Sequence, residues 1–397
     1  MRDFRKFRVI QNEFIKKNNK PYKRYFFNKV DFNNNLIGII GARGVGKSTF
    51  LIQYLLQAPY ELSQKLYISA DLIDIDSLYD FAYDFYKEGG KLLIIDEIHK
   101  YTNFEKELKN IYDSLDIKII FSGSSAINLD NSKADLSRRA VIYDVKGLSF
   151  REFLELKYDM KLDSYTLEEI VTNHINIAME LDLKFDIYKD TKEYFEFGYY
   201  PFYFENEHSY HIKLNETINT IIEVDIPSVF PIEYTNIINL KKLVKLVCSS
   251  KPFSINIKDM LEKLNMKNDY NRLYKYLYYL KKAKVFNILY PKSRGDNIFS
   301  KPSKLYLSNT NLHYSYCNNS EVGTIREVFF MSMFDEDRLS IPNKGDFVVD
   351  DRYIFEVGGK NKSFKQIKDL PDSFVVSDDI EIGSGNKIPL WLFGFLY

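Results

Sequence analysis

Short apolar runs alternate with amphipathic segments over the first 150 residues of the chain. The apolar runs lie at residues 36–40, 65–70, 92–95, 117–122 and 141–145. Helical patterns separate most of these runs, at residues 48–56, 78–86 and 105–112. Strands that alternate with helices are typical of a parallel sheet covered by helices. The pattern therefore predicts an α/β domain over residues 1–150.

The pattern becomes helical after this domain. Residues 151–235 are rich in tyrosine and predict a helical lid or connector. Residues 236–300 contain three helical segments and then two extended pieces, which is the element order of a winged helix with a wing tip near Lys292 and Arg294.

The C-terminal residues 301–397 contain both helical and strand patterns of apolar residues. A helical pattern near 325–333 precedes a hairpin formed by 346–349 and 353–357, and an apolar run at 390–396 follows. The run is short and continuous, so it predicts a buried strand. The segment is expected to form a small α/β domain.

Bulk composition is that of a globular protein, with 45% hydrophobic and 28% charged residues in 397. Domains usually hold about 100 to 200 residues, so two to four domains are expected. Only Cys248 and Cys317 are present, which predicts neither a disulfide framework nor a cysteine metal site. This cysteine usage favours a reducing cytoplasm. No apolar run reaches membrane-spanning length, so no membrane partner is expected.

Charge is distributed unevenly along the chain. Residues 236–304 carry sixteen Lys or Arg and four Asp or Glu, a net charge of +12. Since the formal net charge of the chain is zero, the remaining residues carry −12. A basic module favours a polyanion such as DNA as a partner, and a solvated lysine-rich face is the alternative.

A glycine-rich loop follows the first apolar run and matches the pattern G-x-x-x-x-G-K-[ST]. Its residues are Gly41, Ala42, Arg43, Gly44, Val45, Gly46, Lys47, Ser48 and Thr49. Such a loop cradles phosphates with its N–H groups at the start of a helix. Lys47 is expected to pair with the β- and γ-phosphates of ATP, and the Ser48 hydroxyl to bind Mg²⁺.

Asp96 and Glu97 end the third apolar run. A central parallel strand reads as a continuous apolar run, and its carboxyl end reaches the crevice where ligands bind. Asp96 is expected to hold Mg²⁺ directly or through water, and Glu97 to orient the attacking water. The acidic run is third in sequence, which is the order of additional-strand P-loop ATPases, AAA-like enzymes that hydrolyse with a glutamate.

Two further residues are weaker catalytic candidates. Ser124 follows the fourth apolar run, where a hydroxyl can sense the γ-phosphate, and a simple turn residue is the alternative. Arg139 is a candidate arginine finger, acting in cis or on a neighbouring copy, and a surface salt bridge is its alternative. A finger given to a neighbour would imply a homo-oligomer or another protein partner.

Two other patterns are set aside. Residues 28–31 read Asn-Lys-Val-Asp, the guanine-selecting N-K-x-D, but this tetrapeptide precedes the phosphate loop, whereas GTPases place it far after the loop. ATP therefore remains the expected nucleotide. His99 is interpreted as a structural or surface residue, because Glu97 already fills the role of the base.

These motifs together resemble a family of prokaryotic AAA-type ATPases in which a P-loop domain is joined to a winged helix and a restriction-endonuclease-like domain. The matching segments are residues 41–49, 94–98, 121–125, 136–140 and 148–153. The resemblance covers nearly the whole chain when the C-terminal motifs are included. It implies ATP binding and hydrolysis, but no particular cellular task.

The C-terminal domain of that family looks like the PD-(D/E)xK nucleases. Their metal site uses a helix Glu, a strand Asp, and a strand Glu followed by Lys, and Glu327, Asp346, Glu356 and Lys360 occupy these places in order. The spacing departs from the family, because E-x-x-x-K puts Lys360 one pleat too far along a regular strand. Its side chain either reaches back or is turned away by a glycine bulge.

The combined prediction is an ATPase with four parts, at residues 1–150, 151–235, 236–300 and 301–397, that couples nucleotide state to DNA binding. An ATP-regulated, metal-dependent nuclease is the first alternative. A signalling ATPase whose winged helix is a structural spacer is the second.

Overall fold

A computed structural model describes residues 3–72, 75–124, 136, 138–230, 232–248, 256–266, 268–290, 302–318 and 320–397. The chain divides into two compact units. Unit 1 comprises Met1–Gly147 and Val224–Pro231, and unit 2 comprises Leu148–Glu223 and Ile232–Tyr397. The predicted connector, winged-helix region and C-terminal domain therefore share one unit, apart from the short segment that belongs to unit 1.

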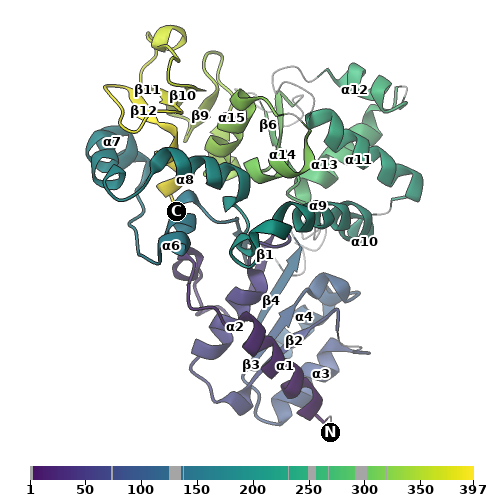
Figure 1. Cartoon of the computed structure of the whole chain (residues 1–397). Coiled ribbons are helices and arrows are strands. Elements are labelled where there is room, and N and C mark those ends of the chain that lie inside the picture. The colour runs from purple at the N-terminus through teal and green to yellow at the C-terminus, as the bar shows by residue number, and fades with distance from the viewer. Residues whose placement is uncertain are drawn as a thin grey trace. The chain divides into compact units, whose positions relative to one another are not determined.

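Unit 1 is built on a parallel five-stranded sheet with the order β2-β3-β4-β1-β5 (Figure 1). All five predicted strands are present, as β1 (Leu36–Gly41), β2 (Lys65–Ser69), β3 (Leu92–Asp96), β4 (Lys118–Ser124) and β5 (Val141–Val145). Strand β4 lies between β1, which enters the glycine-rich loop, and β3, which ends at Asp96. The strand that lies between the glycine-rich loop and the acidic strand in sequence, as predicted, is β2, and it forms the edge of the sheet beside β3.

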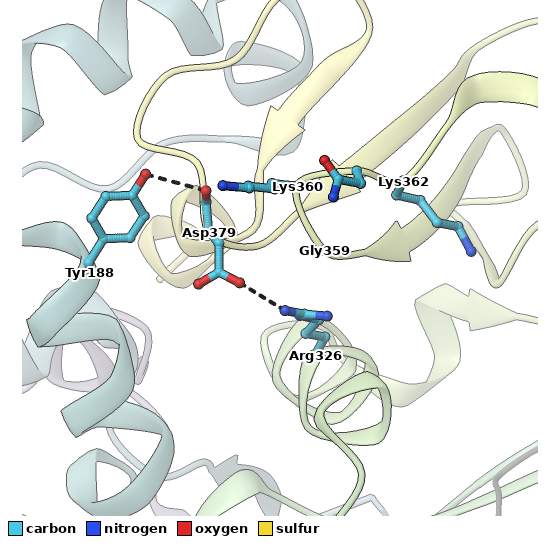
Figure 2. A pocket seen from close by; sticks show the side chains of 7 residues that line it. Tyr188, Arg326, Gly359, Lys360, Lys362 and Asp379 are labelled. Carbon is cyan, nitrogen blue, oxygen red and sulfur yellow. Dashed lines mark hydrogen bonds and ion pairs between the residues drawn. The ribbon is translucent and has the colours of Figure 1, made fainter.

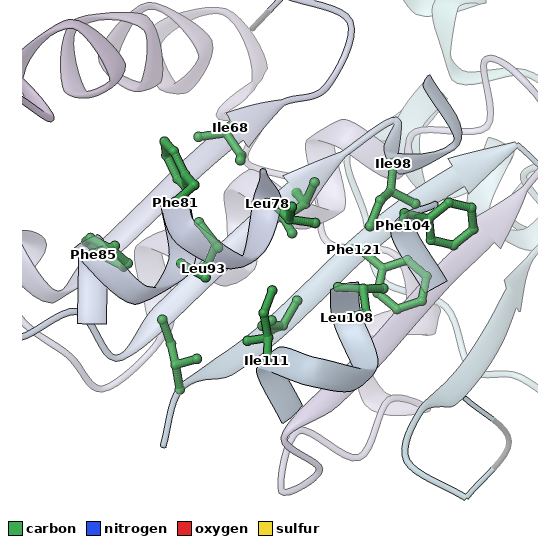
Figure 3. Close-up of a cluster of buried hydrophobic side chains, with 14 of the residues drawn as sticks. Ile68, Leu78, Phe81, Phe85, Leu93, Ile98, Phe104, Leu108, Ile111 and Phe121 are labelled. Carbon is green, nitrogen blue, oxygen red and sulfur yellow. The ribbon is translucent and has the colours of Figure 1, made fainter. Parts of the chain in front are cut away.

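Helices cover this sheet and build its core. They are α1 (Arg5–Asn18), α2 (Lys47–Gln57), α3 (Leu78–Lys87) and α4 (Phe104–Ser114). The short helix α10 (Ile226–Val229), from the distant segment, also belongs to unit 1. Phe81 of α3 and Leu108 of α4 belong to a buried cluster that includes Leu93 and Ile95 of β3 (Figure 3). Alternate strand residues face opposite sides of a sheet. Because both faces are buried, β3 is apolar at every position up to Asp96.

Single-turn elements complete unit 1. They are the 3₁₀ turns η1 (Tyr25–Asn28), η2 (Leu62–Gln64) and η3 (Ile98–Lys100). Turn η3 begins immediately after Glu97, so the chain reverses at the acidic pair.

The first part of unit 2 is helical, as predicted. It contains α6 (Phe150–Tyr158), α7 (Leu167–Asp182), α8 (Ile187–Glu193), η4 (Tyr194–Gly198), η5 (Pro201–Phe204), η6 (Glu207–Ser209), α9 (Tyr210–Thr220) and η7 (Ile221–Asp225), whose last residues pass into unit 1. Helix α6 begins at a capping box in which Ser149 and Glu152 bond each other's backbone N–H groups.

Three helices and a two-stranded antiparallel sheet follow. They are α11 (Tyr234–Cys248), α12 (Ile257–Lys263), α13 (Tyr270–Lys282), β6 (Phe286–Leu289) and β7 (Lys304–Leu307). This is the element order expected of residues 236–300, with the second strand beginning later than predicted. The predicted wing tip with Lys292 and Arg294 lies outside the described residues.

The rest of unit 2 is a five-stranded mixed sheet with helices. Its elements are α14 (Thr310–Tyr316), α15 (Val322–Ser332), η8 (Glu336–Arg338), β8 (Leu339–Ser340), β9 (Phe347–Val349), β10 (Tyr353–Gly358), η9 (Phe364–Gln366), β11 (Ser373–Ser377), β12 (Lys387–Pro389) and η10 (Leu390–Phe395), with the sheet order β12-β11-β10-β9-β8. The predicted hairpin is β9 and β10, which turn at Asp350 and Asp351, both with positive φ.

Two expectations about this unit are wrong. The apolar run at 390–396 is a 3₁₀ helix over Leu390–Phe395, because a short run buried on all sides carries no strand period. The two cysteines, predicted to make no disulfide, form a Cys248–Cys317 bond between the end of α11 and the residue after α14. Their sequence separation of 69 residues hides this proximity, and the bond removes the basis for inferring a reducing compartment from cysteine usage.

Within the described residues, no helix combines the length and apolar character needed to cross a membrane.

Candidate functional site

The glycine-rich loop joins β1 to the first turn of α2. Gly44 and Gly46 have φ values of 85° and 95°, which L side chains rarely adopt. A Cβ on Gly41 would lie 2.5 Å from the carbonyl oxygen of Val145. Glycine is therefore needed at these three positions for the loop to wrap and to pack against β5.

Lys47 is the first residue of α2 and is buried. Its Nζ donates to the carbonyl oxygens of Gly41 (3.1 Å) and Ala42 (3.0 Å), so its ammonium is held back over the loop. Ser48 follows it at the positive end of the helix, where N–H groups and the helix dipole favour phosphate. The predicted phosphate-binding residues are thus gathered at one place.

Asp96 lies at the carboxyl end of β3 and is buried. The Tyr67 hydroxyl donates to its Oδ2 at 2.6 Å, and the Ser122 hydroxyl donates to its Oδ1. Burial and the Asp96 charge raise the pKa of Tyr67 far above its usual range, so Tyr67 remains a donor. Sequence reasoning missed Tyr67 and Ser122, because strand pairing brings them to Asp96 and no local motif marks them.

The oxygen donors fit Mg²⁺. A carboxylate from Asp96 and a hydroxyl from Ser48, completed by nucleotide phosphates and water, are the ligand types that this ion uses at phosphate-transfer sites.

Glu97 has a strained backbone, with φ 54° and ψ 40° in the left-handed region. Its N–H donates to the Ser122 hydroxyl at 3.1 Å, which helps to hold this conformation. Strain in a non-glycine residue is typical of functional sites. Burial raises the pKa of the Glu97 carboxyl, and the nearby Lys47 ammonium opposes that rise.

His99 connects Glu97 with the end of β4. Its Nε2 lies 3.4 Å from Glu97 Oε2, and its Nδ1 accepts the backbone N–H of Ser124 at 3.3 Å. Because Nδ1 is an acceptor, the ring proton lies on Nε2, toward the carboxylate. Burial and the Lys100 charge lower the pKa of His99 to about 4, so the ring is neutral. The structural interpretation of His99 agrees with this geometry, but its position links Glu97 to the candidate sensor Ser124.

Arg139 pairs with an acidic side chain of unit 1. Its guanidinium makes two hydrogen bonds with Asp113, at 2.7 and 2.8 Å. This is the salt-bridge alternative predicted for Arg139. Residues 125–135 and 137, which precede Arg139, lie outside the described residues.

Asp225 is a site residue that sequence reasoning missed. Its carboxylate oxygens both lie 3.4 Å from Arg43 Nη1, and Oδ1 lies 3.7 Å from Lys100 Nζ. It is separated from Arg43 by 182 residues, so no sequence pattern relates the two. The carboxylate is thus placed between the phosphate loop and the turn after Glu97.

The second predicted site contains a cation from the chain itself. Lys304 Nζ donates to Glu327 Oε2 and to Asp346 Oδ1, both at 3.2 Å. Tyr306 donates to Glu327, and the N–H of Val357 donates to Asp346 Oδ2 at 2.9 Å. Burial raises the pKa of Glu327, and the Lys304 charge opposes that rise. The two carboxylates are brought together as predicted, but around an ammonium.

Lys360 is not the lysine that contacts Glu356. Lys362 Nζ lies 2.5 Å from Glu356 Oε1, while Lys360 lines an open pocket of about 570 Å³ with Arg326 and Asp379 (Figure 2). The alternative in which the glycines turn Lys360 away therefore holds. Within the described parts of the chain, no three or more His, Cys, Asp or Glu residues are arranged to hold a metal.

Two protein families match segments of this chain, and a relative matches most of its length. Residues 33–154 match a family described as an AAA domain, and residues 188–321 match a domain of unknown function. The uncharacterized protein MJ1637 of Methanocaldococcus jannaschii is 27% identical over 417 residues, which cover 93% of this chain and 87% of that protein. The AAA match contains the glycine-rich loop and the Asp96–Glu97 pair, so this part of unit 1 is similar to AAA-type P-loop domains.

Solved structures are more distant. The Walker-type ATPase paby2304 of Pyrococcus abyssi is 12% identical, with 79% of this chain and 95% of that chain covered and a TM-score of 0.40. The Aeropyrum pernix Orc1 protein in complex with DNA is 11% identical, with 77% and 90% covered and a TM-score of 0.31.

Proposed function

We propose that the protein binds and hydrolyses ATP at the carboxyl edge of the unit 1 sheet and uses the nucleotide state to control DNA binding. The observation that carries the ATPase assignment is the position of Glu97. It follows the strand that ends at Asp96, one strand away from the strand that enters the phosphate loop. Its strained backbone holds a half-buried carboxylate at this edge.

Each residue of the site has a distinct part in hydrolysis. The loop N–H groups and Lys47 bind the phosphates, and Lys47 exchanges its two carbonyl partners for phosphate oxygens. Ser48 and Asp96 would hold Mg²⁺, which neutralises charge developing on the phosphates. Glu97 orients and activates water, and the neutral His99 ring lies 3.4 Å from its carboxylate. Ser124 senses the γ-phosphate from the end of β4.

Two substitutions test this assignment. Lys47→Ala should reduce ATP turnover by at least about 100-fold, because loss of one charge-stabilising group costs that much. Glu97→Gln should reduce ATP turnover to a similar extent but leave ATP binding intact. Steady-state phosphate release and ATP titration measure the two quantities. Lys87→Ala, at the exposed end of α3, is the matched control. Turnover retained in either site variant would remove the assignment.

The proposal for DNA rests on the exposed face of α13. Tyr270, Tyr274 and Tyr278 recur at every fourth position and are 36–38% exposed, and Lys275 is exposed beside them. Residues four apart share one helix face. A face of tyrosines and lysines in a segment of charge +12 suits a phosphate backbone, and α13 is the third helix of the proposed winged helix.

Salt dependence tests this interface. Each phosphate neutralised contributes about −0.9 to the slope of log affinity against log salt. Lys275→Ala should flatten the slope for duplex DNA by roughly one unit. Lys184→Ala, whose lysine pairs with Glu180 on α7, should leave the slope unchanged. An unchanged slope in Lys275→Ala, or no DNA binding at low salt, would favour the spacer alternative.

A further inference from the structure

Asp225 is an unusual residue to find at a phosphate site, because it brings negative charge where phosphates bind. Its side chain is 2% exposed, whereas those of its partners Arg43 and Lys100 are 48% and 27% exposed. A buried carboxylate is stable only when counter-charges or hydrogen bonds compensate for lost water. The seating of Asp225 in unit 1 therefore depends on these two cations.

The same two cations flank the nucleotide site. Arg43 belongs to the phosphate loop, between Gly41 and Gly46, and Lys100 is three residues after Glu97. Phosphates bound by the loop N–H groups lie next to Arg43 and are negative. Asp225 and the phosphates thus compete for one pair of positive charges.

The segment that carries Asp225 is a link between the units. Asp225 ends η7, a π-helical turn, and such turns are frequent at functional sites. The segment Val224–Pro231 belongs to unit 1, while the residues before and after it belong to unit 2. The chain then enters α11, the first helix of the proposed winged helix. A shift of this segment reaches α11 through the covalent backbone.

We propose that Asp225 is a positioning residue that competes with nucleotide phosphates for Arg43 and Lys100, so that ATP binding loosens the segment Val224–Pro231 from unit 1. This proposal rests on the proposed ATP site and deepens it by assigning the element that reports its occupancy. Linkage requires reciprocity: if ATP weakens the seating of Asp225, then Asp225 weakens the binding of ATP.

The sign of one substitution separates this role from a structural one. Asp225→Asn removes the competing charge and should tighten ATP binding at least fivefold, at the low end of typical allosteric couplings. A residue that merely supports the site would weaken ATP binding when replaced. The tightening should be lost in the Arg43→Gln, Asp225→Asn double variant, because a cation released by Asp225 is then missing. Asp116→Asn, an exposed acid paired with Lys91, is the matched control.

The experiment is calorimetric titration of ATP into these variants in a Glu97→Gln background, so that ATP is not consumed. It is combined with hydrogen exchange of the full chain carrying Glu97→Gln alone, in which ATP should raise the exchange of the amides in residues 224–230. ATP binding of equal or lower strength in Asp225→Asn, or hydrogen exchange unchanged by bound ATP, would overturn the proposed role of Asp225 and leave the proposed ATP site standing. Absence of ATP binding in every variant would overturn the proposed function, and the proposed role of Asp225 with it.

Discussion

Asp96 in unit 1 and the Glu327–Asp346 pair in unit 2 are buried acidic groups, and they differ in what compensates for their charge. At the proposed nucleotide site, hydroxyl groups of Tyr67 and Ser122 hold Asp96, while Lys47 donates to backbone carbonyls. In unit 2, the Lys304 ammonium sits between Glu327 and Asp346 and is itself buried.

This difference separates a site built for a ligand from a site that is already complete. Hydroxyls orient Asp96 without cancelling its charge, so the carboxylate can still attract a magnesium ion. Lys304 cancels the charge of the unit 2 carboxylates with the chain's own cation. In this arrangement the chain's own ammonium occupies the place between the two carboxylates that the nuclease alternative gives to a metal ion.

The largest expected effect comes from removing the internal cation. Lys304→Met should destabilise unit 2 by about 3–5 kcal/mol, because two buried carboxylates lose their partner. Unit 2 contains the single tryptophan, Trp391, which is buried, so its fluorescence during urea unfolding reports on this unit. Adding Glu327→Gln and Asp346→Asn to Lys304→Met should recover much of the loss.

Metal dependence completes that test. Mn²⁺ should shift the unfolding midpoint of the wild-type chain no more than that of Asp346→Asn. A wild-type stabilisation by Mn²⁺ that Asp346→Asn abolishes would show that the two sites are alike and would restore the nuclease alternative.

A smaller effect concerns the nucleotide site. The pKa of His99 is lowered to about 4 from its usual 6.5, so the folded state binds a proton less readily than the unfolded state. The resulting stability is present above pH 6.5 and is lost as the pH falls toward 4, by about 1.4 kcal/mol per pH unit. His99→Asn should remove this pH-dependent contribution to the free energy of unfolding. The difference in urea midpoint between wild type and His99→Asn, measured by circular dichroism at pH 7.5 and 5.5, isolates it from other histidines. A difference independent of pH would contradict a neutral His99 beside Glu97.

Much of unit 1 could be predicted from the sequence because its chemistry is local. The glycine-rich loop is one continuous segment, and β3 is apolar at each position up to Asp96 because both faces of the strand are buried. The run at 390–396 has the same apolar character and forms a 3₁₀ helix, since burial on all sides erases the period that distinguishes helix from strand.

The partners of the acidic residues could not be predicted, because they are set by tertiary contacts. Tyr67 reaches Asp96 across a strand pair, Lys304 reaches Glu327 from 23 residues away, and Asp225 reaches Arg43 from 182 residues away. Motif spacing placed the carboxylates correctly and assigned the wrong lysine to Glu356. Lys362 makes that contact after the chain turns at Gly358 and Gly359.

The central claim is that the nucleotide held in unit 1 sets the affinity of the protein for DNA. The most direct test is the dissociation constant of the Glu97→Gln chain for duplex DNA at one fixed salt concentration, measured with saturating ATP and with saturating ADP. The account predicts that the two constants differ at least about fivefold, the lower end of typical coupling between sites. Equal constants, with both nucleotides shown to be bound, would contradict it.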